Sequence, residues 1–300
     1  MKNKIWIAVL LLAMACATDT RETPKGYKYR LVKSGEGEVV KAGEFLMLNM
    51  VFKDGNDSVW NDTRDQEIPL LLSIRDEKNK DQEEGIDEIF RLLKKGDSVV
   101  FSLPAKTLFE KTWGQPVPDQ IDSTSNFTFF MGVKDILNKD QVQALEQAIM
   151  NEQKTAQMTT DSEILENYLS ENNILAEKTE SGLRYIITKE GKGEKVVAGQ
   201  EVKIHYAGYL LDGTLFDTSM ESAAKASGTF TEGRPYDPLS LTAGSGQVIQ
   251  GWEEAIMLMK KGTKMRVWIP SPLAYGPQRR SALIKENSIL IFDMEMVEIK

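Results

Sequence analysis

Cysteine and histidine are almost absent from this 300-residue sequence, which contains one of each. Because Cys16 has no second cysteine to pair with, we expect no intramolecular disulfide, and stability must come from packing. The sole histidine, His205, argues against Ser-His-Asp and Cys-His catalysis, which need a base beside an activated nucleophile. The same counts leave no cluster of Cys and His for a metal. We therefore expect no metal ion and no cofactor, and interpret His205 as a structural residue.

An excess of basic residues is also lacking. The sequence has 37 Lys and Arg against 45 Asp and Glu, a net charge of −8, and no basic stripe runs along it. Nucleic acids are bound by clustered positive charge, so we expect no nucleic-acid partner. With 41% hydrophobic residues the chain can bury ordinary cores, and its length favours two domains.

The amino-terminal apolar run, from Ile5 to Met14, is too short to span a bilayer. It follows two lysines and ends at a small residue, which is typical of a cleaved secretion signal over residues 1–15. Residues 12–16, Leu-Ala-Met-Ala-Cys, resemble a bacterial lipobox with Ala13 where leucine is usual. The resemblance implies that Cys16 becomes the acylated first residue. We expect an extracytoplasmic protein held by a lipid anchor only to a bacterial cell membrane, in the periplasm or at the outer membrane; the alternative is a buried thiol in an ordinary signal peptide.

The two halves of the sequence look like an internal repeat. At an offset of 156 residues, the matching pairs are Gly26 and Gly182, Tyr29 and Tyr185, Lys33 and Lys189, Gly35 and Gly191, Gly37 and Gly193, and Gly43 and Gly199. At an offset of 166, they are Gly85 and Gly251, Leu92 and Leu258, residues 94–96 and 260–262, and Pro104 and Pro270. We predict related domains over residues 26–135 and 179–300, with residues 16–25 as a tether.

Residues 136–178 are predicted to form a helical linker. The stretch from Lys134 to Lys178 contains no glycine or proline, and its leucines and isoleucines fall at helical spacing. We expect two helices, with Thr160-Asp161 as the N-cap of the second because a short polar side chain there satisfies free backbone donors. The linker is interpreted as a rigid spacer; the alternative is a dimerisation surface, which would make the chain a homodimer.

Hydrophobic periodicity in the second half predicts an antiparallel sheet and one amphipathic helix. The helix has apolar residues at Trp252, Ala255, Ile256 and Met259, and Gly262 is its expected terminator. Alternation with period two marks the strands, at Val202, Ile204 and Tyr206, at Met265, Val267 and Ile269, and at Leu290, Phe292, Met294 and Met296. The first half repeats this pattern less cleanly. The predicted fold class is therefore α+β in both domains.

Four motifs in the second half resemble those of FKBP-type peptidyl-prolyl isomerases, in the family's order. They are residues 202–208 (VKIHYAG), residues 212–217 (DGTLFD), residues 247–254 (QVIQGWEE), and Ile269-Pro270 followed by Tyr275-Gly276. The resemblance covers residues 182–300. It implies two FKBP-like domains in which the sheet wraps around the helix and encloses a pocket between them, joined by the helical connector.

The resemblance also implies roles for individual residues, carried over position by position. Asp217, Tyr206, Tyr275 and Ile249 are the expected catalytic residues: the Ile249 N–H and the Tyr275 hydroxyl would donate to substrate carbonyls, and Asp217 would polarise the site. The expected substrate-binding residues are Trp252 as the pocket floor and, as its walls, Phe216, Leu239, Val248, Ile284 and Phe292. The alternative for each wall residue is plain core packing, and for Asp217 a turn residue after a strand.

Two features depart from the family's pattern. A long loop rich in Ala, Ser, Gly and Thr lies between Asp217 and Pro238, and Leu239 and Leu241 stand where phenylalanines are frequent. The rim of the pocket is therefore expected to differ, and the preferred residue before proline does not follow from the sequence.

The first half departs more severely. The alignment places Met50 opposite Tyr206, Trp60 opposite Phe216, Asn61 opposite Asp217, Ile86 opposite Trp252 and Phe109 opposite Tyr275. Because these replacements remove the polar groups of the site, we expect a degenerate copy without catalysis. Such a copy would bind client chains, dimerise, or hold the second domain away from the membrane.

Proline isomerisation needs no nucleophile and no metal. Rotation about an X-Pro bond crosses a barrier of about 18 to 20 kcal/mol because amide resonance is lost in the twisted state. The expected function is non-covalent stabilisation of that state in an aromatic pocket, acting on proline-containing segments of unfolded or folding exported proteins. The alternative is a non-catalytic chaperone or scaffold lipoprotein that binds proline-containing segments.

Overall fold

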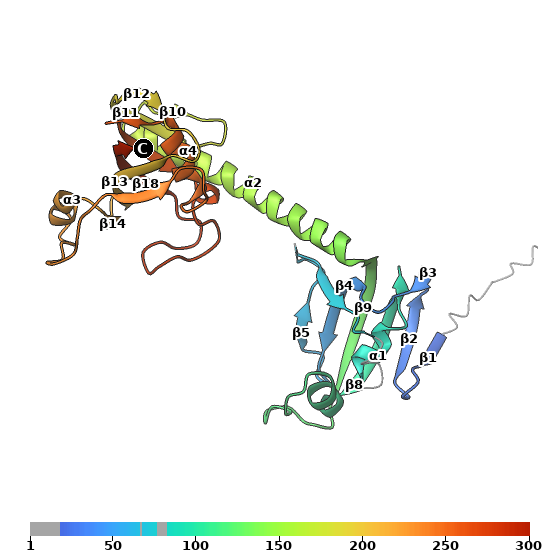
Figure 1. Ribbon diagram of the computed structural model, residues 1–300. Helices are drawn as coiled ribbons and strands as arrows, with labels where there is room; N and C mark the ends of the chain where they lie inside the picture. The colour runs from blue at the N-terminus through green and yellow to red at the C-terminus, as the bar shows by residue number, and fades with distance from the viewer. Residues whose placement is uncertain (1–18, 67, 77–82) are drawn as a thin grey trace, which may run out of the picture. The chain divides into compact units, whose positions relative to one another are not determined.

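The computed structural model describes residues 19–66, 68–76 and 83–300 (Figure 1). The predicted signal peptide and Cys16 lie outside these residues. The described chain divides into two compact units, residues 1–149 and residues 150–300, and each is considered by itself. Within the described part of the chain, no helix combines the length and the hydropathy needed to cross a membrane.

The first unit is built on an antiparallel seven-stranded sheet. Along the sheet the order is β1 (Asp19–Glu22), β2 (Lys28–Lys33), β8 (Ser98–Pro104), β9 (Asn126–Leu137), β4 (Phe45–Lys53) and β5 (Val59–Asp62), and β6 (Leu70–Ser73) also pairs with β4. The other elements are the strand pair β3 (Glu36–Val39) and β7 (Lys94–Lys95), helix α1 (Ile86–Phe90) and a π-helix (Thr107–Thr112). Part of the expected tether, residues 19–22, therefore forms the edge strand β1.

The second unit has a sheet of the same order. Its strands run β10 (Glu177–Lys178), β11 (Arg184–Lys189), β17 (Lys264–Ile269), β18 (Leu290–Ile299), β13 (Glu201–Leu210) and β14 (Leu215–Thr218), and β15 (Leu239–Thr242) also pairs with β13. The other elements are the strand pair β12 (Lys192–Lys195) and β16 (Lys260–Lys261), helices α3 (Glu221–Ala226) and α4 (Gln250–Leu258), and a 3-10 helix (Ser271–Leu273). The predicted α+β class with two antiparallel sheets is confirmed.

The amphipathic helix α4 packs on one face of the second sheet. Ala255, Ile256 and Met259 are fully buried against inward-facing residues of the strands. The helix ends at Leu258, earlier than expected, and Gly262 instead adopts φ 83° in the turn between β16 and β17. A side chain at that φ would be strained, so glycine serves a strand turn here and not the helix end.

The predicted pair of connecting helices is wrong, because α2 is one continuous helix (Lys139–Glu171). It begins with a reciprocal cap in which the Gln141 N–H donates to the Asn138 side chain and the Asn138 N–H donates to the Gln141 side chain. It ends where Asn173 takes φ 53° and the Ile174 N–H donates to the Leu169 carbonyl. With no glycine or proline between these signals, nothing interrupts the helix.

Thr160-Asp161 is therefore no N-cap. The Thr160 hydroxyl donates to the Ala156 carbonyl one turn back within α2, and Asp161 is buried in mid-helix. A cap was expected there because short polar residues also favour helix starts, and only a tertiary contact of Asp161, described below, separates the two cases.

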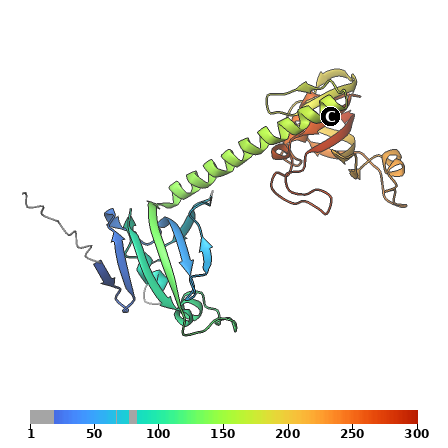
Figure 2. The same cartoon turned by 180° about the vertical axis from the view of Figure 1, so that it is seen from behind.

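The carboxyl-terminal half of α2 belongs to the second unit. Figure 2 shows this end of the green helix beside the strands of the second unit. Leu165 and Leu169 pack there with Trp268, Ile289 and Ile291, on the face of the sheet that does not contact α4. The fully buried Arg184 of β11 also donates to Glu166 of the same helix. The expected linker, residues 136–178, is thus divided between the two units, and α2 packs on the second one from Met158 to Leu169.

Candidate active site

A cavity of about 400 Å³ opens in the second unit between helix α4 and the sheet. Its lining combines apolar rings with a few polar groups. The lining residues are Tyr206, Phe216, Asp217, Leu239, Gly246, Gln247, Val248, Ile249, Trp252, Tyr275, Arg280 and Phe292. Most of the residues expected at the site are therefore brought together by the fold.

Trp252, on the first turn of α4, is the centre of an aromatic cluster. Its ring lies edge-on to Tyr206, with centroids 5.2 Å apart, and to Phe292, at 5.1 Å. Phe216 in turn lies edge-on to Phe292 at 5.5 Å. Such edge-to-face pairs add stability beyond the area that they bury. Trp252 is 4% exposed, so the cluster forms a rigid apolar floor.

Gly208 of β13 gives these rings their space. A Cβ atom at this position would lie 2.6 Å from the Phe216 ring and 2.7 Å from the Phe292 ring. Both contacts are too short for any side chain, so only glycine permits this arrangement of aromatic residues. The cavity therefore depends on a missing side chain as much as on those present.

Several hydrogen-bond donors in the cavity lining have no acceptor among the described residues, and they include the backbone N–H of Ile249, the hydroxyl of Tyr275 and the indole N–H of Trp252. Ile249 is the N-cap residue of α4, and its carbonyl accepts the N–H groups of Trp252 and Glu253. Amide groups at a helix start lack intrahelical acceptors, which leaves the Ile249 N–H free for a ligand. Both the Ile249 N–H and the Tyr275 hydroxyl are thus available to an acceptor group of a ligand.

Asp217, at the end of β14, is held by three donors. Its carboxylate accepts from the Tyr206 hydroxyl at 2.6 Å, from the Arg234 guanidinium at 2.8 Å and from the Thr218 N–H at 2.9 Å. Partial burial raises the pKa of Asp217, but the bonds from Arg234 and Tyr206 outweigh it and hold that pKa below its ordinary value. The carboxylate is therefore ionised at neutral pH.

The same contact acts on the tyrosine. Burial, together with the bond to the Asp217 carboxylate, raises the pKa of Tyr206 above its ordinary value of 10.0. Since its hydroxyl proton is committed to Asp217, Tyr206 serves as a wall of the cavity and as a support for the carboxylate. It is not a free donor.

Two arginines at the site were missed by sequence reasoning. Arg234 comes from the long loop after β14, and its guanidinium bonds Asp217 and the Thr218 carbonyl and lies 5.4 Å from the Tyr236 ring. Arg280 lines the cavity with its guanidinium 5.6 Å from the centroid of the Tyr275 ring. No local pattern marks either residue, because the loops that carry them have no hydrophobic period.

The remaining expected residues lie as follows. Phe216 and Val248 line the cavity, and Leu239 lies at its rim, 38% exposed. Ile284 does not line it; this residue is 6% exposed within the core, and its carbonyl accepts the Arg280 N–H. Its expected place in the wall is therefore not what the structure shows.

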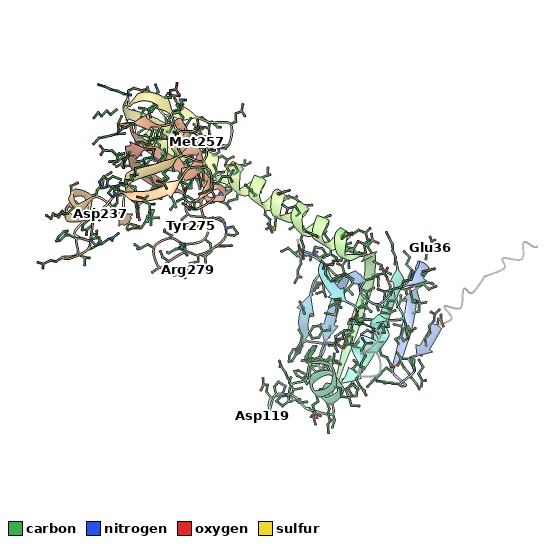
Figure 3. The ribbon with its side chains drawn as sticks, in the orientation of Figure 1. Glu36, Asp119, Asp237, Met257, Tyr275 and Arg279 are labelled. Carbon is green, nitrogen blue, oxygen red and sulfur yellow. The ribbon has the colours of Figure 1, made fainter. Side chains whose placement is uncertain are left out.

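His205 does not line the cavity, and its Nδ1 lies 3.1 Å from the Ser219 hydroxyl. Figure 3 shows Tyr275 at the base of the loop that carries Arg279 outward. In the described part of the chain no group of three or more His, Cys, Asp or Glu residues could hold a metal ion.

The equivalent space in the first unit is filled. The pairing of β4 with β5 and β9 matches that of β13 with β14 and β18, and it places Phe52 at the position of Gly208. The Phe52 ring stacks on Phe129 at 5.1 Å and also approaches Phe127 and Trp113. A phenylalanine side chain thus occupies the place that glycine leaves open in the second unit.

The other replaced positions complete this aromatic packing. Trp60 lies edge-on to Phe109 and Phe127, at 6.3 Å and 5.0 Å, and the Trp60 indole donates to Asp54. Met50 has no hydroxyl to offer the Asn61 side chain, so no counterpart of the Tyr206 and Asp217 pair exists. The first unit keeps the fold without the polar site.

The sequence model of the FKBP-type peptidyl-prolyl cis-trans isomerase family matches residues 192–297. The matched segment contains the whole lining of the cavity. An FK506-binding protein of Neisseria meningitidis serogroup A is 36% identical over 111 residues, which cover 37% of this chain and 90% of that protein. The chain therefore belongs to the FKBP-type peptidyl-prolyl isomerase family, and the matched segment, residues 192–297, is the part that contains the cavity.

Longer relatives match over the same region. An FKBP-type peptidyl-prolyl cis-trans isomerase FkpA of Aeromonas hydrophila is 42% identical over 122 residues, which cover 41% of this chain and 40% of that protein. The match thus spans about two fifths of the length of this relative. A solved structure of the three FKBP domains of wheat FKBP73 covers 94% of the chain at 17% identity, with a TM-score of 0.35, too low to support an argument on the fold.

Proposed function

We propose that the second unit catalyses cis-trans isomerisation of X-Pro bonds by binding the twisted amide without covalent chemistry. The observation that carries the proposal is the aromatic cavity over Trp252 with two unused donors, the Ile249 N–H and the Tyr275 hydroxyl, in its lining. The apolar prolyl ring of a substrate fits such a floor, and the two donors are free to bind the carbonyl oxygens of the peptide groups beside that ring.

Catalysis follows from what the cavity favours. The planar X-Pro amide is polar and resonance-stabilised, and an apolar surrounding favours it less than water does. In the twisted state resonance is lost, so the amide gives up less solvation on entering the cavity. A preference of about 6 kcal/mol for the twisted state would raise the rate about 10⁴-fold.

The ionised Asp217 contributes through the field that it creates. A negative charge beside the cavity stabilises the positive charge that is left on the carbonyl carbon when the nitrogen lone pair no longer delocalises into it. Tyr206 and Arg234 fix the carboxylate in place, so no reorganisation is needed when the bond rotates.

The test is turnover of a short X-Pro peptide, measured with a protease that cleaves only the trans isomer. We expect the full chain to accelerate isomerisation and Asp217→Ala to lower kcat/KM about tenfold or more. The matched control is Asp293→Ala, which removes an aspartate bonded to Arg266 outside the cavity and should leave turnover unchanged. If the protein binds the peptide but isomerisation proceeds at the uncatalysed rate, the proposal is overturned in favour of a proline-binding chaperone or scaffold.

We further propose that the enzyme acts on exported proteins from a lipid anchor at Cys16. The support is the short apolar run before Cys16 and the small Ala15 next to it. Cys16→Ser should release the protein from the membrane fraction, and mass spectrometry of the wild-type chain should find an acylated amino terminus. An unmodified, soluble mature chain would contradict this anchor.

The first unit is proposed to hold client chains without catalysing their isomerisation. Deleting it should leave turnover of a short peptide unchanged but slow the refolding of a protein whose folding is limited by proline isomerisation. Only the large substrate can touch both units. Equal rates on both substrates after the deletion would leave the spacer role instead.

A further inference from the structure

A buried carboxylate outside the cavity contacts the segment that leads to Tyr275. Asp161, in the middle of α2, is 1% exposed. Its carboxylate accepts the backbone N–H of Ser271 at 2.5 Å and the side-chain amide of Gln157 at 2.7 Å. The first of these bonds joins residues 110 positions apart in the sequence, within the second unit.

A buried carboxylate is unfavourable unless donors compensate for the lost water. Ser271 begins the 3-10 helix (Ser271–Leu273), where backbone N–H groups have no intrahelical acceptor. The side-chain carboxyl group of Asp161 on α2 therefore satisfies this donor. Asp161 thus fixes the start of the 3-10 helix to α2.

Ser271 in turn holds both neighbours of Tyr275. The Ser271 carbonyl accepts the N–H of Ala274 at 2.9 Å and the N–H of Gly276 at 2.8 Å. The backbone on either side of Tyr275 is thus tied to one residue, and that residue is tied to Asp161. Displacing Ser271 would move the Tyr275 hydroxyl relative to the Ile249 N–H.

We propose that Asp161 is a positioning residue for the isomerase site, acting through Ser271 to place the Tyr275 hydroxyl. The inference rests on the proposed function, since it assigns the hydroxyl a role in turnover. It also makes the carboxyl-terminal half of α2 a working part of the enzyme, although this half lies outside the matched segment 192–297.

The first unit supplies an internal comparison. Ala105 occupies the position of Ser271 when the two copies are aligned at Pro104 and Pro270, and its N–H donates to the Ser125 carbonyl at 2.8 Å. There the corresponding ring is Phe109, which has no hydroxyl to position. In the first unit a backbone carbonyl is a sufficient acceptor for this N–H group. Only the second unit has both a carboxylate acceptor, from Asp161, and a tyrosine, Tyr275, to position.

A double-mutant cycle in the full chain tests the proposal. Asp161→Ala should lower kcat/KM for an X-Pro peptide about fivefold in the wild-type background and less than about twofold in a Tyr275→Phe background. Asp161→Asn, which keeps an oxygen acceptor for the Ser271 N–H, should restore most of the loss. Glu163→Ala, which removes an exposed carboxylate on the same helix, is the matched control and should have no effect.

Amide hydrogen exchange gives a readout that is independent of turnover. In Asp161→Ala the N–H groups of Ala274 and Gly276 should exchange about tenfold faster or more, and in Glu163→Ala at the wild-type rate. Equal losses of kcat/KM with and without the Tyr275 hydroxyl, or unchanged exchange at both amides, would overturn the positioning role. A wild-type chain without turnover would refute the proposed function, while the exchange measurement would still decide whether Asp161 holds this segment.

Discussion

The two units share a strand register but differ in one position that decides whether a cavity exists. In each unit a central strand pairs with the same three neighbours, and a side-chain hydroxyl, Thr63 or Ser219, accepts the N–H of the equivalent residue, Met50 or Tyr206. Phe52 fills the space that Gly208 leaves open. The scaffold therefore survives without the site, because its register depends on backbone pairing and not on the pocket residues.

The polar groups differ in the same way. Asp217 in the second unit accepts hydrogen bonds from three donors. At the equivalent positions the first unit has Asn61 in place of Asp217, a methionine in place of the tyrosine that bonds it, and Phe109 in place of Tyr275. The fold persists without the charged group, because the net contribution of a single hydrogen-bonded polar group to stability is small, about 1 kcal/mol. The comparison teaches that the fold does not require the cavity or its charge.

The strongest way to break the difference is to put the first unit's side chain into the second. Gly208→Phe should lower kcat/KM for an X-Pro peptide at least about 100-fold, because the new ring needs the space of Phe216 and Phe292. Overpacking should also destabilise the second unit by about 1 to 3 kcal/mol. Tyr209→Phe, on the opposite face of the same strand, is the control and should retain turnover. An active Gly208→Phe enzyme would show that the cavity is not the site.

The reverse change should open space without creating activity. Phe52→Gly removes a buried aromatic side chain and should lower the free energy of unfolding of the first unit by about 3 to 5 kcal/mol. Turnover by the full chain should not change, since Met50, Asn61 and Phe109 provide no carboxylate or hydroxyl. Denaturant unfolding and the peptide assay together check this prediction, and added turnover would contradict it.

A smaller effect is expected from removing the Tyr275 hydroxyl, a hydrogen-bond donor that the first unit lacks. Tyr275→Phe converts the residue to the one found at the equivalent position of the first unit. Loss of one hydrogen bond made in the transition state should lower kcat about tenfold, with the melting temperature unchanged, because the hydroxyl has no acceptor among the described residues. A change in KM alone would assign this hydroxyl to ground-state binding.

The smallest effect should come from pH. The pKa of Asp217 lies below 3.8 and that of Tyr206 above 10.0, so turnover should be constant from about pH 5 to about pH 9. Because the pKa of Asp217 is lowered on folding, the stability that its ionised form contributes is present above pH 3.8 and is lost as pH falls through the folded-state pKa. The turnover rate at each pH can be measured by exchange spectroscopy of a prolyl peptide, which needs no protease. A titration step between about pH 5 and about pH 9 would contradict this prediction.

Much of the second unit could be predicted from the sequence because its signals are periodic or local. Alternating strands and the apolar face of α4 define the sheet and its helix, and the offset of 156 residues anticipates the shared register. The same offset also pairs Phe52 with Gly208, so the sequence contained the signal for the filled pocket, although the prediction rested on the polar replacements.

What the sequence could not predict depends on distant contacts. Thr160-Asp161 has the composition of a helix start, and only the bond from Asp161 to Ser271 shows why an aspartate lies buried in mid-helix. Arg234 reaches Asp217 from a loop without any period, and Ile284 has the apolar character of a wall residue but is enclosed in the core. Each outcome is fixed by tertiary packing, which short-range patterns do not contain.

The central claim is that one of two copies of the fold carries the chemistry, and it is tested most directly by measuring each unit alone. Residues 19–149 and 150–300 have separate cores, so each can be produced and its fold checked by circular dichroism before assay on the same X-Pro peptide. We predict that residues 150–300 have the kcat/KM of the full chain and that residues 19–149 leave the uncatalysed rate unchanged. Turnover by folded residues 19–149, or its absence from folded residues 150–300, would contradict the account.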